Sequence, residues 1–117
     1  MQFMLLIHHE GESLTATQLP QMMQDYMVFT QDLVKSGKFK AGDRLESSSG
    51  ARTVRVRNGK TVTTDGPFAE TKEQLGGYYI VEAKDLEEAV AIAARIPGAR
   101  TGSVEVRTVA SMPARQG

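Results

Sequence analysis

Hydrophobic and polar positions repeat with two different periods along this chain, and these periods predict its elements. Residues 3–9 carry apolar side chains on both alternating faces, which is typical of a strand that is buried on both sides. Residues 19–34 instead repeat apolar side chains every three or four positions, which predicts an amphipathic helix with Pro20 in its first turn and Gly37 as its stop. Core packing is the favoured role of its methionines, which could also form an adaptable binding surface. The predicted buried stripe is Leu19, Met22, Met23, Tyr26, Met27, Leu33 and Val34.

The middle of the chain predicts an antiparallel hairpin. Residues 54–57 and 60–63 alternate around Asn58-Gly59, a pair that favours a type I′ turn. A weaker strand is expected over residues 39–46, followed by a polar loop. Four basic side chains gather on the hairpin without aromatic residues between them, so we expect a solvated or dimer-contacting ribbon rather than a nucleic-acid site. They are Arg52, Arg55, Arg57 and Lys60.

The second half of the chain predicts a further helix between two strands. We expect residues 69–75 to form about two helical turns that end at Gly76-Gly77, and a strand over residues 78–82. Asp85 and Glu88 predict a capping box for a helix that ends at Pro97-Gly98. Its expected buried stripe is Leu86, Ala89, Val90, Ala93 and Ala94. A last strand is predicted over residues 103–108.

The order of these elements predicts an α+β fold. Strand, helix, strand, inserted hairpin, strand, helix, strand is the order of two split βαβ halves, a ferredoxin-like antiparallel sheet with two helices on one face. Because the helices cover one face only, the apolar second face of the first strand needs another cover, most simply a second copy of the chain. We therefore expect a homodimer in which two sheets form an α+β barrel, with a ligand site in its interior or mouth. Residues 1–109 are expected to be a single domain and residues 110–117 a flexible tail.

Composition narrows the function classes. The chain has 117 residues, and its 14 acidic side chains balance 14 basic ones, so nothing favours nucleic acid or an anionic membrane as a partner. The absence of cysteine excludes disulfides, thiol catalysis and zinc–thiolate sites. The apolar N-terminal segment does not begin with basic residues and is followed immediately by His8 and His9. Both features are unlike a signal peptide or a membrane span. We expect a cytoplasmic protein.

The leading candidate for chemistry is Asp65, on the stiff corner made with Gly66 and Pro67. Beside Phe68 and Tyr78 this carboxylate could be partly desolvated and act as a general base. The alternative is architectural: Asp65 satisfies the backbone donors of its turn and caps the short helix that follows.

Two adjacent histidines are the next candidates. His8 and His9 face opposite ways on a strand, so at most one of them can point into a given site, where it would pair with Asp65. These histidines together with Glu10, Glu12 or Asp65 lack a recognised ligand spacing, so no metal site is predicted. No cofactor motif is present either, and we expect no cofactor.

The remaining candidates line the strands. Tyr78 or Tyr79 could supply a hydroxyl, and Glu105 and Arg107 share one face of the last strand, where Arg107 would recognise an anionic ligand. Core or dimer packing is the alternative for all four.

The run Asp65-Gly66-Pro67-Phe68, continued by Ala69-Glu70-Thr71-Lys72-Glu73-Gln74-Leu75-Gly76-Gly77-Tyr78, resembles the signature of the YCII-related proteins, in particular their DGPF-domain branch. The similarity to that branch extends to four other segments: the first strand at residues 4–7, the hairpin, the predicted helix end at residues 94–97 and the last strand at residues 102–107. The resemblance implies a dimeric ferredoxin-like fold and an enzymatic site with a His and Asp pair, in which Asp65 matches the motif. It also implies association with sigma-factor systems in bacteria.

These observations support two hypotheses of function. The first is a cofactor-independent enzyme that acts on a small organic molecule, anionic ones included, with Asp65 as general base. The alternative is a non-catalytic module that binds a small molecule or a sigma factor, in which the signature stretch serves structure alone.

Overall fold

A computed structural model describes residues 1–10, 18–67 and 73–111. In chain order the described residues form β1 (Gln2–Glu10), α1 (Leu19–Lys35), β2 (Phe39–Arg44), β3 (Arg52–Arg57), β4 (Lys60–Asp65), β5 (Glu73–Glu82), α2 (Leu86–Ala94) and β6 (Ser103–Thr108), with 3₁₀ turns at Ser48–Gly50 and Pro97–Arg100. The expected loop at residues 11–17, the residues 68–72 expected to enter a short helix, and all but two residues of the expected tail lie outside the described residues.

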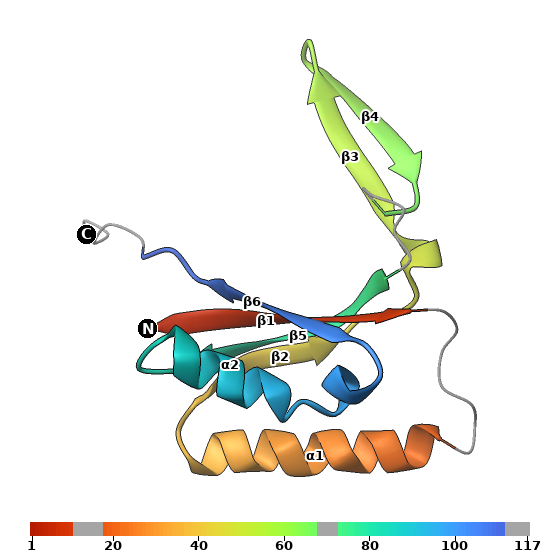
Figure 1. Cartoon of the computed structure of the whole chain (residues 1–117). Coiled ribbons are helices and arrows are strands. Elements are labelled where there is room, and N and C mark those ends of the chain that lie inside the picture. The colour runs from red at the N-terminus through yellow and green to blue at the C-terminus, as the bar shows by residue number, and fades with distance from the viewer. Residues whose placement is uncertain (11–17, 68–72, 112–117) are drawn as a thin grey trace.

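The main sheet has four antiparallel strands in the order β2-β5-β1-β6. With the hairpin set aside, this is the strand order of a ferredoxin-like fold, and the predicted fold class is confirmed. Both helices lie on one side of the sheet (Figure 1). The opposite side, called the open face below, carries no helix from the described part of the chain.

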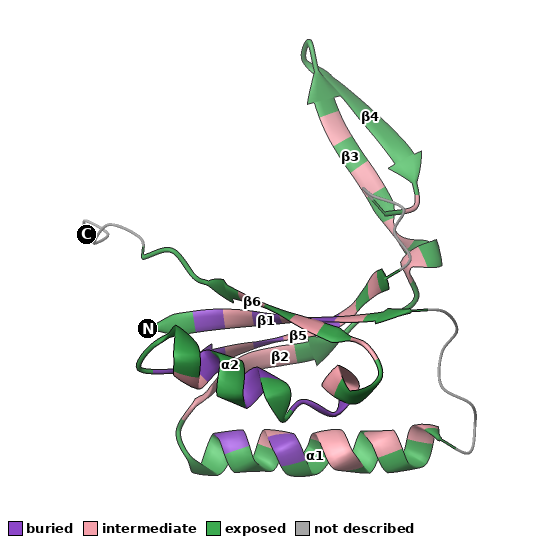
Figure 2. Ribbon diagram, in the orientation of Figure 1, coloured by how far each residue is buried: buried purple, intermediate pink, exposed green. Residues whose placement is uncertain are grey.

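The core lies between the helices and one face of the sheet (Figure 2). The side chains of Phe3 and Leu5 on β1 are fully buried there, and Val81 on β5 and Leu33 on α1 are at most 1% exposed. Tyr79 packs edge-on against Phe29, with the ring centroids 5.2 Å apart. The alternation predicted for β1 is therefore confirmed, with Phe3, Leu5 and Ile7 on the helix side.

The buried stripe predicted for α1 is only partly correct. Leu33 is buried, but the other buried residue of α1 is Phe29, which the predicted stripe omitted. Met23, Met27 and Val34 are 55–60% exposed. The helix has apolar residues on two neighbouring stripes, and only the stripe nearest the sheet becomes core. Its limits agree with the prediction, since Pro20 lies in the first turn and Gly37 adopts a φ of 74° just after the end.

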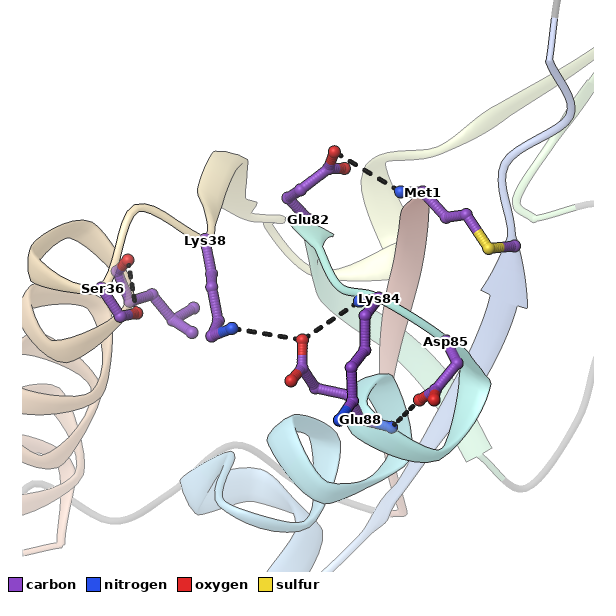
Figure 3. A network of polar contacts seen from close by, with 8 residues as sticks. Met1, Ser36, Lys38, Glu82, Lys84, Asp85 and Glu88 are labelled. Carbon is purple, nitrogen blue, oxygen red and sulfur yellow. Dashed lines mark hydrogen bonds and ion pairs between the residues drawn. The ribbon is translucent and has the colours of Figure 1, made fainter.

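The cap predicted for α2 is half confirmed (Figure 3). The Glu88 amide donates to the Asp85 carboxylate at 2.9 Å, as a capping box requires. The Glu88 carboxylate, however, accepts from the Lys84 amide and from Lys38 Nζ, each at 3.1 Å. These two donors, the Lys84 amide first, hold the pKa of Glu88 below its usual range. The residues buried on α2 are Ala89, Ile92 and Ala93.

The buried stripe predicted for α2 is wrong at three residues, which point away from the core. Leu86 and Val90 are about half exposed, and Ala94 is exposed as well. The face of α2 that meets the core is instead the one that carries Ala89, Ile92 and Ala93.

The helix predicted to end at Gly76-Gly77 is wrong over residues 73–77, which form a strand. β5 begins at Glu73 and runs through both glycines. Ile7 pairs with Gly77 and His8 pairs with Leu75, so Gly76 is an extra residue, a β-bulge. A Cβ on Gly76 would lie 2.7 Å from the ring of His9, and one on Gly77 would lie 3.0 Å from the Asp43 carbonyl oxygen. Gly77 is therefore packed closely against the backbone of β2, and Gly76 lies beside the His9 ring, so neither glycine ends a helix.

The predicted β3–β4 hairpin is confirmed. Asn58 and Gly59 both have positive φ, at 52° and 74°, as a type I′ turn needs. The hairpin rises from the sheet on the side away from the helices (Figure 1). It lengthens the molecule, since the radius of gyration is 16.6 Å where a compact chain of this size has about 13 Å.

Candidate functional site

The open face carries most of the polar side chains that the sequence singled out. Because Phe3, Leu5 and Ile7 are buried on the helix side, the alternate residues of β1 lie on the open face. Strand pairing then aligns rows across the sheet. One row is Asp43, Tyr78, Leu6 and Glu105, and the next is Ala41, Ile80, Met4 and Arg107. The site is thus a sheet surface with an apolar centre and polar ends.

His8, Glu105 and Arg107 form a connected polar group on this face. His8 Nε2 lies 3.6 Å from Glu105 Oε1, and the second oxygen of Glu105 lies 3.9 Å from Arg107 Nη1. The His8 side chain is 25% exposed, while Glu105 and Arg107 are more than half exposed. The carboxylate of Glu105 therefore lies between an imidazole and the permanent positive charge of Arg107. This group has the parts of a proton-transfer site beside an anion-binding residue.

Tyr78 and Asp43 form a second polar pair on the open face. The Tyr78 hydroxyl donates to Asp43 Oδ2 at 2.8 Å. This hydrogen bond, together with the negative charge of Asp43, raises the pKa of Tyr78 above its usual range. The hydroxyl therefore stays protonated at neutral pH, and because its single proton is donated to Asp43 it offers a ligand an acceptor oxygen.

All three tyrosines of the chain should ionise late, which predicts a loss of stability at alkaline pH. Burial raises the pKa of Tyr26 and of Tyr79, and the Asp43 hydrogen bond raises the pKa of Tyr78. Folding therefore favours the protonated hydroxyls. Their contribution to stability is complete below about pH 10, the pKa of tyrosine in the unfolded chain, and is lost as the pH rises through the higher pKa values of the folded chain. We expect tyrosinate absorbance to appear at higher pH in the native chain than in denaturant. Coincident titrations would contradict this.

Two of the predicted site residues lie away from the open face. Tyr79 is only 8% exposed and its hydroxyl lies 2.7 Å from Thr30 Oγ1, so it is a residue of the core. His9 points to the opposite side of β1 from His8, with its ring over Gly76. Of the two histidines, His8 is the one on the open face.

Asp65 is at the base of the hairpin, apart from the open face. Its carboxylate lies 2.7 Å from Arg52 Nη1, and its side chain is 86% exposed. The partial burial expected of Asp65 is therefore absent in the single chain, and among the described residues no contact joins Asp65 to His8 or His9. The adjoining Gly66 has a φ of 99°, and its amide donates to the Ala51 carbonyl at 2.8 Å. These contacts close the base of the hairpin.

The other predicted motif residues are placed as follows. Pro67 follows the hairpin and is exposed, and Phe68 lies outside the described residues. Glu73, expected on a short charged helix, is instead in β5, where its carboxylate accepts a hydrogen bond from Ser103 Oγ at 2.8 Å. In the part of the chain that is described, no three His, Asp or Glu side chains gather closely enough to hold a metal ion. In the same part, no helix is both long and apolar enough to cross a membrane.

The sequence did not single out Asp43 and Ser103, which also lie on the open face. Asp43 belongs to a strand with weak alternation, and only its register opposite Tyr78 reveals it. A separate hollow of about 610 Å³ runs along the outer side of α1, lined by Met23, Met27 and Val34 among others. It holds no acid–base pair, so the open face remains the better candidate.

Comparisons with known proteins identify a family for this chain. The model of the YCII-related domain matches residues 1–113. An uncharacterized protein of Rhizobium meliloti (strain 1021) is 40% identical over 92 residues, which cover 77% of this chain and 74% of that protein. The family-model match over residues 1–113 includes the four strands of the sheet, both helices and the hairpin. This chain belongs to the family of YCII-related domain proteins.

Proposed function

We propose that this protein is a cofactor-independent enzyme that transfers a proton on a small organic molecule, anionic molecules included, at the open face of its sheet. The observation that carries the proposal is the half-buried His8 beside Glu105, at 3.6 Å, on a sheet face that no described helix covers. Imidazole is the side chain best suited to give and take a proton near neutral pH.

The neighbours of His8 have complementary roles in this proposal. Glu105, whose carboxylate lies 3.6 Å from the imidazole, positions its ring. Arg107 contacts an anionic group of the substrate, and the Tyr78 hydroxyl, whose proton is donated to Asp43, accepts a hydrogen bond from a donor group of the substrate. The geometry favours His8 over Asp65 as the base, since Asp65 is exposed and paired with Arg52. Asp65 then serves to hold the hairpin, together with the corner that resembles the DGPF-domain signature.

A homodimer is part of the proposal. The open face carries Met4, Leu6 and Ile80, which are only partly buried in the single chain. A second copy placed over this face would cover these apolar side chains and exclude water from His8. Exclusion of water strengthens the electrostatic interactions on which proton transfer depends.

The two histidines allow a direct test, because they are the only imidazoles in the chain and lie on opposite faces. A panel of small carboxylic acids and lactones is added to the protein, and the two sets of imidazole resonances are followed by NMR. We expect a ligand to shift the resonances of His8 and leave those of His9 nearly unchanged.

Turnover of a ligand found in this way distinguishes the residues. His8→Gln should reduce turnover by about 100-fold, the usual contribution of a positioned acid or base. His9→Gln is the matched control and should retain activity, as should Asp65→Asn. Loss of activity in Asp65→Asn with activity kept in His8→Gln would return the base role to Asp65. Binding without turnover would favour the non-catalytic module.

A further inference from the structure

The β3–β4 hairpin exposes apolar side chains that its own chain does not cover. Val54 and Val56 are about 60% exposed and Val62 is 47% exposed, and no residue of either strand is buried. An isolated two-stranded hairpin is at best marginally stable in water, so it needs a surface on which to pack. In this structure it rises away from the sheet and the helices (Figure 1).

The two faces of the hairpin differ in character. The register places Val54 and Val56 on one face, opposite Thr63 and Thr61. Arg55, Arg57 and Lys60 lie on the other face, with Val62. The hairpin thus has one face with two exposed valines and an opposite face with three basic side chains.

The open face of the sheet complements this hairpin in charge and in polarity. Residues 52–65 contain four basic side chains and one acidic one, a net charge of +3, so the rest of this neutral chain carries −3. Five carboxylates lie on the open-face side of their strands, against the guanidinium of Arg107. They are Glu10, Asp43, Glu73, Glu82 and Glu105.

One end of the open face concentrates this negative charge. Glu10 on β1 is directly opposite Glu73 on β5, next to His8. A hairpin of net positive charge is attracted to this negatively charged end, and its valine face matches the apolar centre at Met4, Leu6 and Ile80.

We propose that the β3–β4 hairpin is an arm that docks on the open face of a second copy of this chain. Val54 and Val56 of one copy pack on Leu6 and Ile80 of the other, and the net positive charge of the arm favours its approach to a face that carries five carboxylates. The candidate site is then built by two copies, because the arm covers the surface around His8. The proposal uses the same face as the proposed function but does not depend on any reaction there.

Cross-linking tests the docking directly, because the chain has no cysteine of its own. Val56→Cys and Leu6→Cys are made as separate proteins with tags of different size, mixed at equal concentration and oxidised. We expect a disulfide between the two proteins to form at least about tenfold faster than in the matched mixture of Val62→Cys with Leu6→Cys, because a disulfide needs Cβ atoms about 4 Å apart and Val62 is on the other face of the hairpin. Met4→Cys and Ile80→Cys repeat the test at neighbouring positions.

Each other outcome overturns the proposal. Equal rates for Val56→Cys and Val62→Cys, or no cross-link with any of the three sheet positions, would show that this hairpin face does not meet the sheet. A double variant, Val56→Cys with Leu6→Cys in one chain, that closes within a monomer would show the hairpin packing on its own sheet. The readout needs no ligand, so its failure is distinct from a failure of the ligand and turnover tests.

Discussion

Replacing Leu33 by alanine is expected to lower the free energy of unfolding by about 2–5 kcal/mol, the usual cost of removing a large buried side chain without collapse of the cavity. Leu33 is 1% exposed and lies on the side of α1 that faces the sheet. It belongs to one core cluster with Phe3, Leu5 and Tyr79, which are held in a hydrogen-bonded sheet and cannot move to fill the space. The change should appear as a lower midpoint in urea with a similar slope.

Met27→Ala on the same helix is the matched control. Met27 is a comparably large side chain but 60% exposed, so its truncation should cost less than about 0.5 kcal/mol. Both variants are compared with the parent at the same protein concentration, because association would shift the midpoint. Equal losses for the two variants would mean that the outer stripe of α1 is buried against another surface in solution.

The error in the α1 stripe shows what periodicity can resolve. The pattern correctly predicted a helix, its start near Pro20 and its end before Gly37. Apolar side chains occupy two adjacent stripes, one through Phe29 and Leu33 and one through Met23 and Met27. A period of 3.6 residues fits either stripe, and only contact with the sheet selects between them.

The glycine pair shows a second limit. Gly76-Gly77 after a charged segment favours a helix end, yet both residues are inside β5. The reason is a long-range one: the ring of His9 and the backbone of Asp43 approach these positions from neighbouring strands. Local sequence contains no sign of such neighbours, so a turn signal and a close-packing signal cannot be told apart there.

The site itself was predicted in parts but not as an arrangement. His8, Tyr78, Glu105 and Arg107 were each singled out from the sequence, and alternation on β6 correctly put Glu105 and Arg107 on one face. Their grouping depends on register, which aligns Leu6 with both Tyr78 and Glu105. The catalytic role of Asp65 stays a prediction, and the structure adds that its side chain is exposed at the base of the hairpin, beside Arg52.

Gly102→Ala is expected to be at least as harmful as a core truncation, although it only adds a methyl group. A Cβ on Gly102 would overlap the main-chain oxygen of His8 and lie 3.3 Å from that of Gly98. Both obstacles are backbone atoms, which cannot rotate away as a side chain would. The Gly102 amide also donates to the Gly98 carbonyl at 2.8 Å, which fixes its position. We expect a loss of about 3 kcal/mol or more, at or above the upper end of the usual range for overpacking.

Gly50→Ala is the control for this prediction, because no atom lies within 4 Å of a Cβ placed at Gly50 and its φ is not positive. That variant should unfold at nearly the parent's urea concentration. Gly102→Ala should also move the NMR resonances of His8 more than those of Leu33, since β1 must shift at His8 to admit the methyl group while the core beneath α1 need not. A stable Gly102→Ala protein with unmoved His8 resonances would contradict this prediction. It would show that the turn before β6 shifts to admit the methyl group while β1 stays in place. Position 102 thus links the fold to the candidate site: the backbone that holds His8 on the open face leaves no room for a side chain beside it.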